Sequence, residues 1–153
     1  MEYGVTPIEE LRRVNGLEFM QGLIAGKYPV PPIMQALQFT LDRVEHGVTV
    51  FSGEAKFDFY NPIGTVHGGW VATLLDSCMG CAMHTTMKPG QGYTSLEIKV
   101  TFVRPVLDTT GRVTAEGRVI YAGSRTGTAE GKLTDARGKL LAHSTTTCLI
   151  FPI

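Results

Sequence analysis

The sequence has no excess of charge of either sign, because 14 Lys and Arg residues balance 14 Asp and Glu residues over 153 positions. No run of Lys or Arg forms a basic stripe, so nucleic acid and an anionic membrane surface are poor candidate partners. The chain also lacks an apolar run of about 18 residues and a basic segment followed by an apolar one, so neither a membrane span nor a secretory signal is indicated. We expect one soluble cytoplasmic domain that binds a small molecule.

Cysteine is scarce and odd in number, with three residues in the chain. Two of them form Cys78-x-x-Cys81 inside an apolar stretch, without a second pair of ligands. A disulfide framework, a zinc site or a redox motif would need different surroundings. We therefore expect reduced thiols that fill the core, and neither a metal nor another cofactor.

Charge is nearly absent from one long segment, because Asp76 is the only Asp, Glu, Lys or Arg between Gly68 and Met87. A helix that is apolar nearly all round should be buried. A lone carboxylate inside it would be costly unless it is paired, protonated or used. We predict a long buried helix from Gly68 to about Thr86, and Asp76 is its first candidate for chemistry.

The N-terminal part of the chain has a helical pattern. Thr6 and Glu9 have the spacing of a capping box, with Pro7 at the first helical position. We predict a helix from there to about Gly26. The prolines of Tyr28–Pro32 then end it, because proline removes a donor and favours extended backbone before it.

Period-two patterns predict six strands. Two are expected between Met34 and Phe59, with a hairpin turn at Val44–Gly47. The other four follow the long helix, and their predicted bounds are Tyr93–Arg104, Gly111–Tyr121, Ser124–Thr134 and Lys139–Phe151. Short turns between successive members favour an antiparallel meander.

The first of these four strands alternates clearly, which predicts one packed face and one more polar face. The expected packed face consists of Leu96, Ile98, Val100 and Phe102, and the polar face of Glu97, Lys99 and Thr101. Helices on one face of an antiparallel sheet define an α+β domain. Covering the long helix with six strands needs a strongly curved sheet and a second copy of the domain.

Three short motifs carry a family resemblance. They are Asn61-x5-His67-Gly68-Gly69-x6-Asp76, Thr94-Ser95-Leu96-Glu97-Ile98-Lys99-Val100 and Arg104-Pro105. Together they resemble the phenylacetic-acid-degradation (PaaI-type) branch of the hotdog-fold acyl-CoA thioesterases, over about residues 34–151. The resemblance implies a sheet wrapped around the long helix, protomers paired edge to edge as a homodimer or homotetramer, and active sites at the dimer interface.

The resemblance also divides the chain and assigns its site. Residues 34–153 correspond to the hotdog thioesterase domain, and residues 1–33 form an N-terminal helical extension that caps the substrate pocket or extends an interface. It implies that Asn61 and the His67–Gly69 turn of one chain face Asp76 of the other.

Thioester hydrolysis needs a polarised carbonyl and an attacking group. The backbone N–H of Gly68, at a helix start, is the candidate oxyanion donor, and Gly69 lies beside it. Asp76 is the candidate nucleophile or general base, and the sequence does not choose between these roles. For both glycines and Asp76, the alternative is a purely structural role in a turn or a core.

Further polar residues are candidates for supporting roles in catalysis. Asn61 would orient water or the carboxylate, and its alternative is a turn residue before Pro62. Ser95, with Thr94 beside it, would hydrogen-bond the carboxylate or water, or it is a plain strand hydroxyl. His67 would donate on the thiolate side, or it only fixes the loop.

Coenzyme A carries phosphate groups, so its site needs a few cations. Arg104 and Arg125 are the candidates, with Lys88 as a third, and solvated surface charge is the alternative for each. The acyl pocket could be lined by Trp70, although such residues more often belong to the core. The same holds for Phe59, Met79 and Met83.

The combined prediction is an acyl-CoA thioesterase that hydrolyses an aromatic or medium-chain acyl-CoA to the free acid and coenzyme A. One alternative is a hotdog enoyl-CoA hydratase or dehydratase, which would transfer protons through a histidine. Another is a non-catalytic acyl-CoA-binding module. The His67-Gly68-Gly69 turn favours an oxyanion site over a proton-shuttling histidine, and a lone carboxylate on an apolar helix is not required for binding alone.

Overall fold

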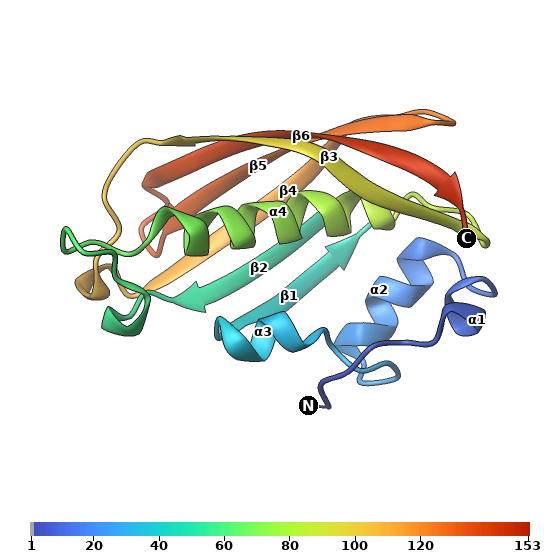
Figure 1. Cartoon of the computed structure of the whole chain (residues 1–153), viewed down its shortest axis with the longest axis horizontal. Helices are drawn as coiled ribbons and strands as arrows, with labels where there is room; N and C mark the ends of the chain where they lie inside the picture. Colours follow the sequence, from blue (N-terminus) through green and yellow to red (C-terminus); the bar gives the residue numbers. More distant parts are fainter. Residues whose placement is uncertain (1) are drawn as a thin grey trace.

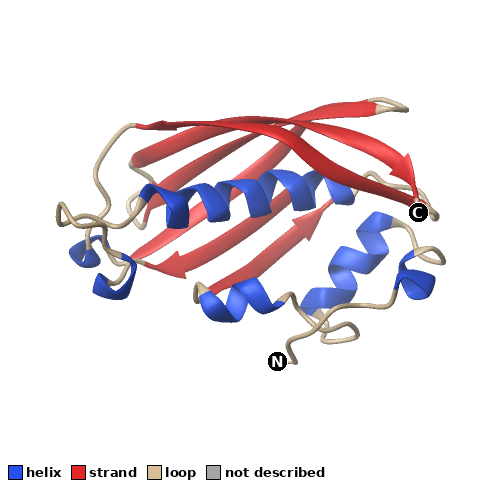
Figure 2. Ribbon diagram, viewed as in Figure 1, coloured by secondary structure: helices blue, strands red, loops and turns tan. Residues whose placement is uncertain are grey.

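The computed structural model describes residues 2–153, which form one six-stranded antiparallel sheet with a long helix against it. The strand order is β1-β2-β4-β5-β6-β3. The sheet curves around helix α4 (Gly68–His84), as Figures 1 and 2 show. This arrangement confirms the predicted α+β hotdog fold.

Helix α4 is the centre of the hydrophobic core. It ends two residues before the predicted Thr86. Leu74, Leu75 and Met79 on its sheet-facing side are 0% exposed. A Cβ at Gly117 of the sheet would collide with the backbone of Cys78, so this glycine allows the helix to lie directly on the strands.

The prediction of one continuous N-terminal helix to about Gly26 is wrong. The structure has two helices there, α1 (Ile8–Leu11) and α2 (Gly16–Ile24), with a turn between them. Asn15 caps α2, because its side-chain oxygen accepts a hydrogen bond of 2.9 Å from the backbone N–H of Glu18. This local cap starts a new helix inside the periodic pattern.

The predicted capping box at Thr6 is also absent. Pro7 occupies the N-cap position of α1, and no side chain caps the helix. The Thr6 hydroxyl is buried without a hydrogen-bond partner among residues 2–153. A third short helix, α3 (Pro32–Ala36), was not predicted, and it begins with a proline at its first position.

The predicted hairpin after the prolines is confirmed. It consists of β1 (Phe39–Glu45) and β2 (Val48–Glu54), which pair antiparallel. Gly47 in the connecting turn has a φ of +75°, a conformation that favours glycine. A short 3-10 helix, η1 (Phe57–Phe59), follows.

The last four predicted strands are confirmed, but the meander holds only for three of them. β4 (Arg112–Ala122), β5 (Thr126–Asp135) and β6 (Leu140–Pro152) pair in succession. β3 (Gln91–Phe102) pairs with β6 instead of β4 and forms an edge of the sheet. The connection after β3 contains the 3-10 helix η2 (Asp108–Thr110) and crosses to the middle of the sheet.

The apolar face of β3 is packed only in part within one chain: Val100 packs against the core, but the other three residues of the predicted face are exposed. Leu96 is 58% exposed, Ile98 39% and Phe102 55%. A register shift between Ser95 and Glu97 displaces Leu96 from the regular alternation. The neighbouring helix α4 therefore leaves much of this edge strand uncovered.

The N-terminal helices belong to the same hydrophobic core as the sheet. Met20 of α2 is 1% exposed, Met34 of α3 is 3% exposed, and both lie in one cluster with Phe51 of β2. Helix α3 spans the predicted boundary between residues 33 and 34. The extension is thus packed onto the sheet and covers its β1 side (Figure 2).

Candidate active site

Asn61 organises the loop that leads into α4. Its Oδ1 accepts hydrogen bonds from the backbone N–H groups of Ile63, at 3.0 Å, and Thr65, at 3.2 Å. Its Nδ2 donates to the Thr65 hydroxyl at 2.8 Å. These contacts are those of a turn residue, the structural alternative for Asn61. A role toward water or the carboxylate stays a prediction.

The two glycine N–H groups of the His67–Gly69 turn differ in whether they are already hydrogen-bonded. His67 is the N-cap of α4, and its Nδ1 accepts a hydrogen bond of 2.8 Å from the N–H of Gly69. With Nδ1 as the acceptor, Nε2 is the ring nitrogen left to act as a hydrogen-bond donor. The N–H of Gly68 makes no hydrogen bond within residues 2–153. Gly68, and not Gly69, thus has the N–H that is available to a substrate oxygen.

Gly68 opens into a groove of about 420 Å³. The groove is also lined by Asn61 and Val71, and by Phe102 and Arg104 at the end of β3. A Cβ at Gly68 would lie 2.9 Å from a ring carbon of Phe102, so the aromatic ring rests against the glycine. The oxyanion candidate therefore has an apolar wall on one side and a cation nearby.

Asp76 is exposed in the single chain, so the prediction of a buried carboxylate is wrong at this level. The reason is that α4 is covered by the sheet on one side only, and Asp76 lies on the other. Ser95 of β3 donates a hydrogen bond of 3.1 Å to Asp76 Oδ1. The structure thus brings together two of the predicted catalytic residues, although they are 19 positions apart.

Two further acidic groups lie near Asp76, and both are held neutral. Burial raises the pKa of Cys81 to about 12, and the charge of Asp76 adds to the effect. Burial, followed by the nearby Cys81, raises the pKa of Tyr93 well above its ordinary value. Sequence reasoning missed Tyr93, although it lies two residues before Ser95 on the same strand face. Both groups therefore stay protonated beside the Asp76 carboxyl group.

Thr94 and Trp70 lie away from Asp76. Thr94 is exposed, and strand alternation directs its side chain to the sheet face opposite to that of Ser95. Trp70 is 3% exposed, stacks on Phe59 with centroids 5.2 Å apart, and donates to the backbone oxygen of Leu37. Its contacts are those of a core residue, the alternative for this position.

The two predicted arginines lie at opposite ends of the molecule. Arg104 follows β3 near the start of α4, whereas Arg125 lies in the β4–β5 turn near the other end (Figure 1). Arg125 lines a separate pocket of about 450 Å³. Gln91 also lines it, and the third predicted cation, Lys88, lies three residues before Gln91 in the chain. One chain therefore does not combine these cations into one site.

Two other cations, which sequence reasoning missed, lie near Arg104. Arg137 and Lys139 of the β5–β6 turn line a pocket of about 400 Å³ together with Arg104. This pocket also shares Pro105 with the Gly68 groove. Their signal in the sequence was the turn Asp135–Gly138, but the long-range contact with Arg104 could not be read from it.

Among residues 2–153, no three His, Cys, Asp or Glu side chains lie close enough together to hold a metal ion. Within the same residues, no helix is long and apolar enough to cross a membrane. The three cysteines are free, with Cys78 and Cys148 buried and Cys81 partly buried.

Comparison with known proteins agrees with the geometry. The family model of the thioesterase superfamily matches residues 63–142, a segment that contains Gly68, Asp76 and Ser95. A candidate esterase of Saccharolobus solfataricus is 30% identical over 112 residues, which cover 73% of this chain and 78% of that protein.

Solved structures share the fold over most of the chain. A candidate thioesterase of Ralstonia eutropha, related to phenylacetic acid degradation, has a TM-score of 0.77 at 26% identity, covering 85% of this chain and 98% of that one. The PaaI protein of the E. coli phenylacetic acid degradation operon has a TM-score of 0.77 at 18% identity, covering 88% and 95%. The chain belongs to the thioesterase superfamily and is a hotdog-fold thioester hydrolase of the PaaI type.

Proposed function

We propose that the protein is an acyl-CoA thioesterase whose active site is completed by a second copy of the chain. The observation that carries the proposal is that the candidate oxyanion donor and the candidate nucleophile or base lie at two different places along α4. A free backbone N–H lies at Gly68, at the start of the helix, and the Ser95-bound carboxylate of Asp76 lies further along it. Each is suited to one half of a thioester hydrolysis.

These two groups are too far apart to act on one carbonyl within a chain. Eight residues of α-helix span about 12 Å. A substrate carbonyl bound to Gly68 would therefore meet the Asp76 of another protomer. Two such sites arise together if two α4 helices run antiparallel, because Gly68 of each then lies near Asp76 of the other.

The exposed edge of the sheet supports this pairing. β3 offers an unpaired backbone edge and exposed apolar side chains at Leu96, Ile98 and Phe102. An edge strand of this kind favours pairing with another strand. We propose a homodimer formed through β3, alone or as half of a homotetramer.

Coenzyme A fits the grooves beside Gly68. The Gly68 groove and the pocket of Arg104, Arg137 and Lys139 are neighbours, since both are lined by Arg104 and Pro105. A thioester carbonyl at Gly68 would place the pantetheine arm along the groove. The phosphates would then meet three cations, which prefer such anions.

Asp76 can act in thioester hydrolysis by either of two routes. As a nucleophile, its carboxylate attacks the thioester carbon, the C–S bond breaks, the CoA thiolate leaves, and water hydrolyses the resulting anhydride. As a general base, it takes a proton from water, whose oxygen attacks the same carbon; the C–S bond then breaks, the CoA thiolate leaves, and the free acid is formed directly. In both routes Gly68 N–H stabilises the oxyanion, Ser95 orients Asp76, and His67 Nε2–H is available to the leaving thiolate. No cofactor enters either route.

The reaction is tested by measuring thiol release with a panel of acyl-CoAs. Gly68→Pro removes the backbone N–H at a helix position where proline is well tolerated, and the preceding His67 already has a compatible ψ of 134°. Gly68→Ala is the matched control, because it adds a Cβ against Phe102 but keeps the N–H. We expect a loss of about 100- to 1,000-fold in Gly68→Pro only.

Equal activity in both Gly68 variants would show that the Gly68 N–H has no role in the mechanism. Wild-type protein that releases no thiol from any acyl-CoA would overturn the proposed function. Formation of enoyl-CoA without thiol would favour the hydratase alternative, which His67 serves poorly because its Nδ1 is bonded to Gly69. Tight binding without any turnover would favour the binding module. The free thiols fit a reducing compartment, and we propose the cytoplasm.

A further inference from the structure

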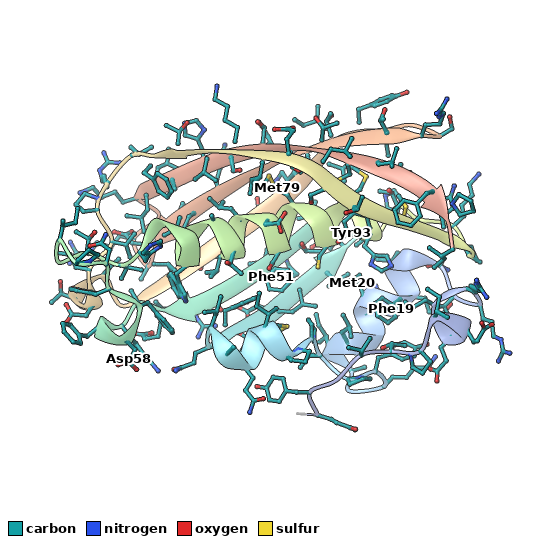
Figure 3. All side chains as sticks on the ribbon, viewed as in Figure 1. Phe19, Met20, Phe51, Asp58, Met79 and Tyr93 are labelled. Atoms are coloured by element: carbon teal, nitrogen blue, oxygen red, sulfur yellow. The ribbon has the colours of Figure 1, made fainter. Side chains whose placement is uncertain are left out.

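A small apolar pocket lies between the N-terminal helices and α4. Its volume is about 50 Å³. Its walls come from α2, α3, the first hairpin and α4, and they include Met20, Leu23, Met34, Phe51, Ser77 and Cys81. Figure 3 shows Met20 and Phe51 on this side of α4, whereas Tyr93 lies toward β3.

The part of α4 that lines the pocket begins directly after the candidate catalytic carboxylate, although Asp76 itself is not part of the lining. Ser77 directly follows Asp76, and Cys81 lies on the same stripe of α4 one turn later. Both residues are further from Gly68 along the helix than Asp76 is. A substrate carbonyl beside Asp76 therefore has coenzyme A on the side of the second copy and this pocket on the side of its own chain.

We propose that the pocket binds the end of the substrate's acyl group, and that the N-terminal helices thereby select straight-chain over aromatic acyl-CoA. The inference rests on the proposed function, because it places the thioester at Asp76. The lining has almost no polar atoms, as a hydrocarbon end requires. The occupant is the alkyl end of a linear acyl chain.

The size of the pocket decides between the two acyl classes. An engineered protein cavity that binds benzene measures about 150 Å³. A pocket of about 50 Å³ is a third of that, so it admits a few methylenes but no aromatic ring. Met34, 3% exposed, and Leu23, 8% exposed, close it from the N-terminal side.

The closing residues give a direct test. Met34→Ala enlarges the pocket, and Ser77→Leu fills it from α4 with a good helix former. Met87→Ala is the matched control, because Met87 is 4% exposed but belongs to a different core cluster. The readouts are thiol release from acyl-CoAs of two to twelve carbons and from phenylacetyl-CoA, and the Kd of the corresponding non-hydrolysable S-alkyl-CoA thioethers.

We expect wild type to prefer straight chains and to bind each added buried methylene about fourfold more tightly up to an optimum. Met34→Ala should move the optimum to longer chains by about two carbons and raise the relative rate with phenylacetyl-CoA. Ser77→Leu should move it to shorter chains, and Met87→Ala should leave it in place.

Several outcomes separate the two proposals. Thiol release with a chain-length optimum unchanged in Met34→Ala and Ser77→Leu would overturn the pocket but not the thioesterase. Absence of thiol release, with thioether binding that shifts in these variants, would overturn the thioesterase but support the pocket. A wild-type preference for phenylacetyl-CoA would also overturn the pocket.

Discussion

The two edges of the sheet are finished in different ways. At the β1 edge, helices α2 and α3 pack onto the strand, and Phe39 is only 3% exposed. At the β3 edge, Leu96 and Phe102 are more than half exposed, and no further strand of residues 2–153 pairs with β3. One edge is completed by the chain itself, and the other is left for a partner.

Helix α4 lies between these edges, and it too has one side covered by the chain and one side exposed. Its sheet-facing side holds Leu75 at 0% exposed, whereas its open side presents Asp76. Residues on the covered side should therefore govern the free energy of unfolding. Residues on the open side and on β3 should govern activity and assembly, and the following predictions test that division.

The largest expected effect is that of Asp76→Asn on activity. The amide cannot act as nucleophile or base, so kcat should fall by about 100- to 10,000-fold. Because Asp76 is exposed, the melting temperature should change little. Steady-state thiol release and thermal unfolding measure the two effects. Asp58→Asn, also exposed, is the control, and a fully active Asp76→Asn would refute the assigned role.

On the covered side, Leu75→Ala should instead lower the free energy of unfolding. Loss of a fully buried leucine leaves a cavity, which costs about 2–5 kcal/mol. Urea denaturation measures it. Thr73→Ala, on the less buried side of the same helix, should cost less than about 1 kcal/mol. Similar losses in both variants would contradict the contrast between the two sides.

His84 links the two regions and should make their contact sensitive to acid. Its ring stacks on Phe19 of α2, with centroids 5.1 Å apart, and meets Tyr93 of β3 at 5.5 Å. Burial lowers the pKa of His84 to about 4 from its ordinary value of 6.5. The folded state therefore favours the neutral ring.

The sign of the pH effect follows from this shift. The stability contributed by neutral His84 is complete above pH 6.5 and is lost as the pH falls toward 4, by at most about 3 kcal/mol. Urea midpoints between pH 7 and 4 measure it. His84→Gln should flatten the profile over this range, whereas His143→Gln, at an exposed site, should not. An unchanged slope in His84→Gln would show that other groups cause the loss.

The smallest expected effect is on assembly through the open edge. Ile98→Asp places a charge on an apolar surface of β3 that is 39% exposed, so the dimer should dissociate about 10- to 100-fold more readily. Light scattering across a concentration series measures this, and activity should fall at the dilutions where monomer appears. Ile120→Asp, at a 60% exposed site on β4, should keep the dimer. Dissociation by Ile120→Asp alone would move the interface away from β3.

The sequence predicted those parts of the fold that depend on local pattern. Apolar residues from Gly68 onward gave α4 within two residues of its end, and the turn at Gly47 gave the first hairpin. The prediction of one N-terminal helix failed because the Asn15 cap starts a second helix, α2, inside a stretch whose apolar residues keep helical spacing. The meander failed at β3 because strand pairing depends on distant partners.

The candidate site shows the same limit. Motif spacing predicted Asp76 with Ser95, and they are in contact. It could not show that Gly69 N–H is occupied by His67 Nδ1, or that Arg137 and Lys139 join Arg104. These contacts depend on side-chain orientation and on a turn brought close by pairing of β5 with β6.

The sequence by itself determined the α+β class, the long apolar helix with one carboxylate, and the glycine turn at its start, because helical and strand periods and caps are written in neighbouring residues. Only the tertiary structure decided that Asp76 is exposed, that β3 is an open edge, and that the N-terminal helices enclose a small pocket beside Ser77. The reason is that burial, strand order and cavity shape result from contacts between segments far apart in the chain, and no local pattern contains them.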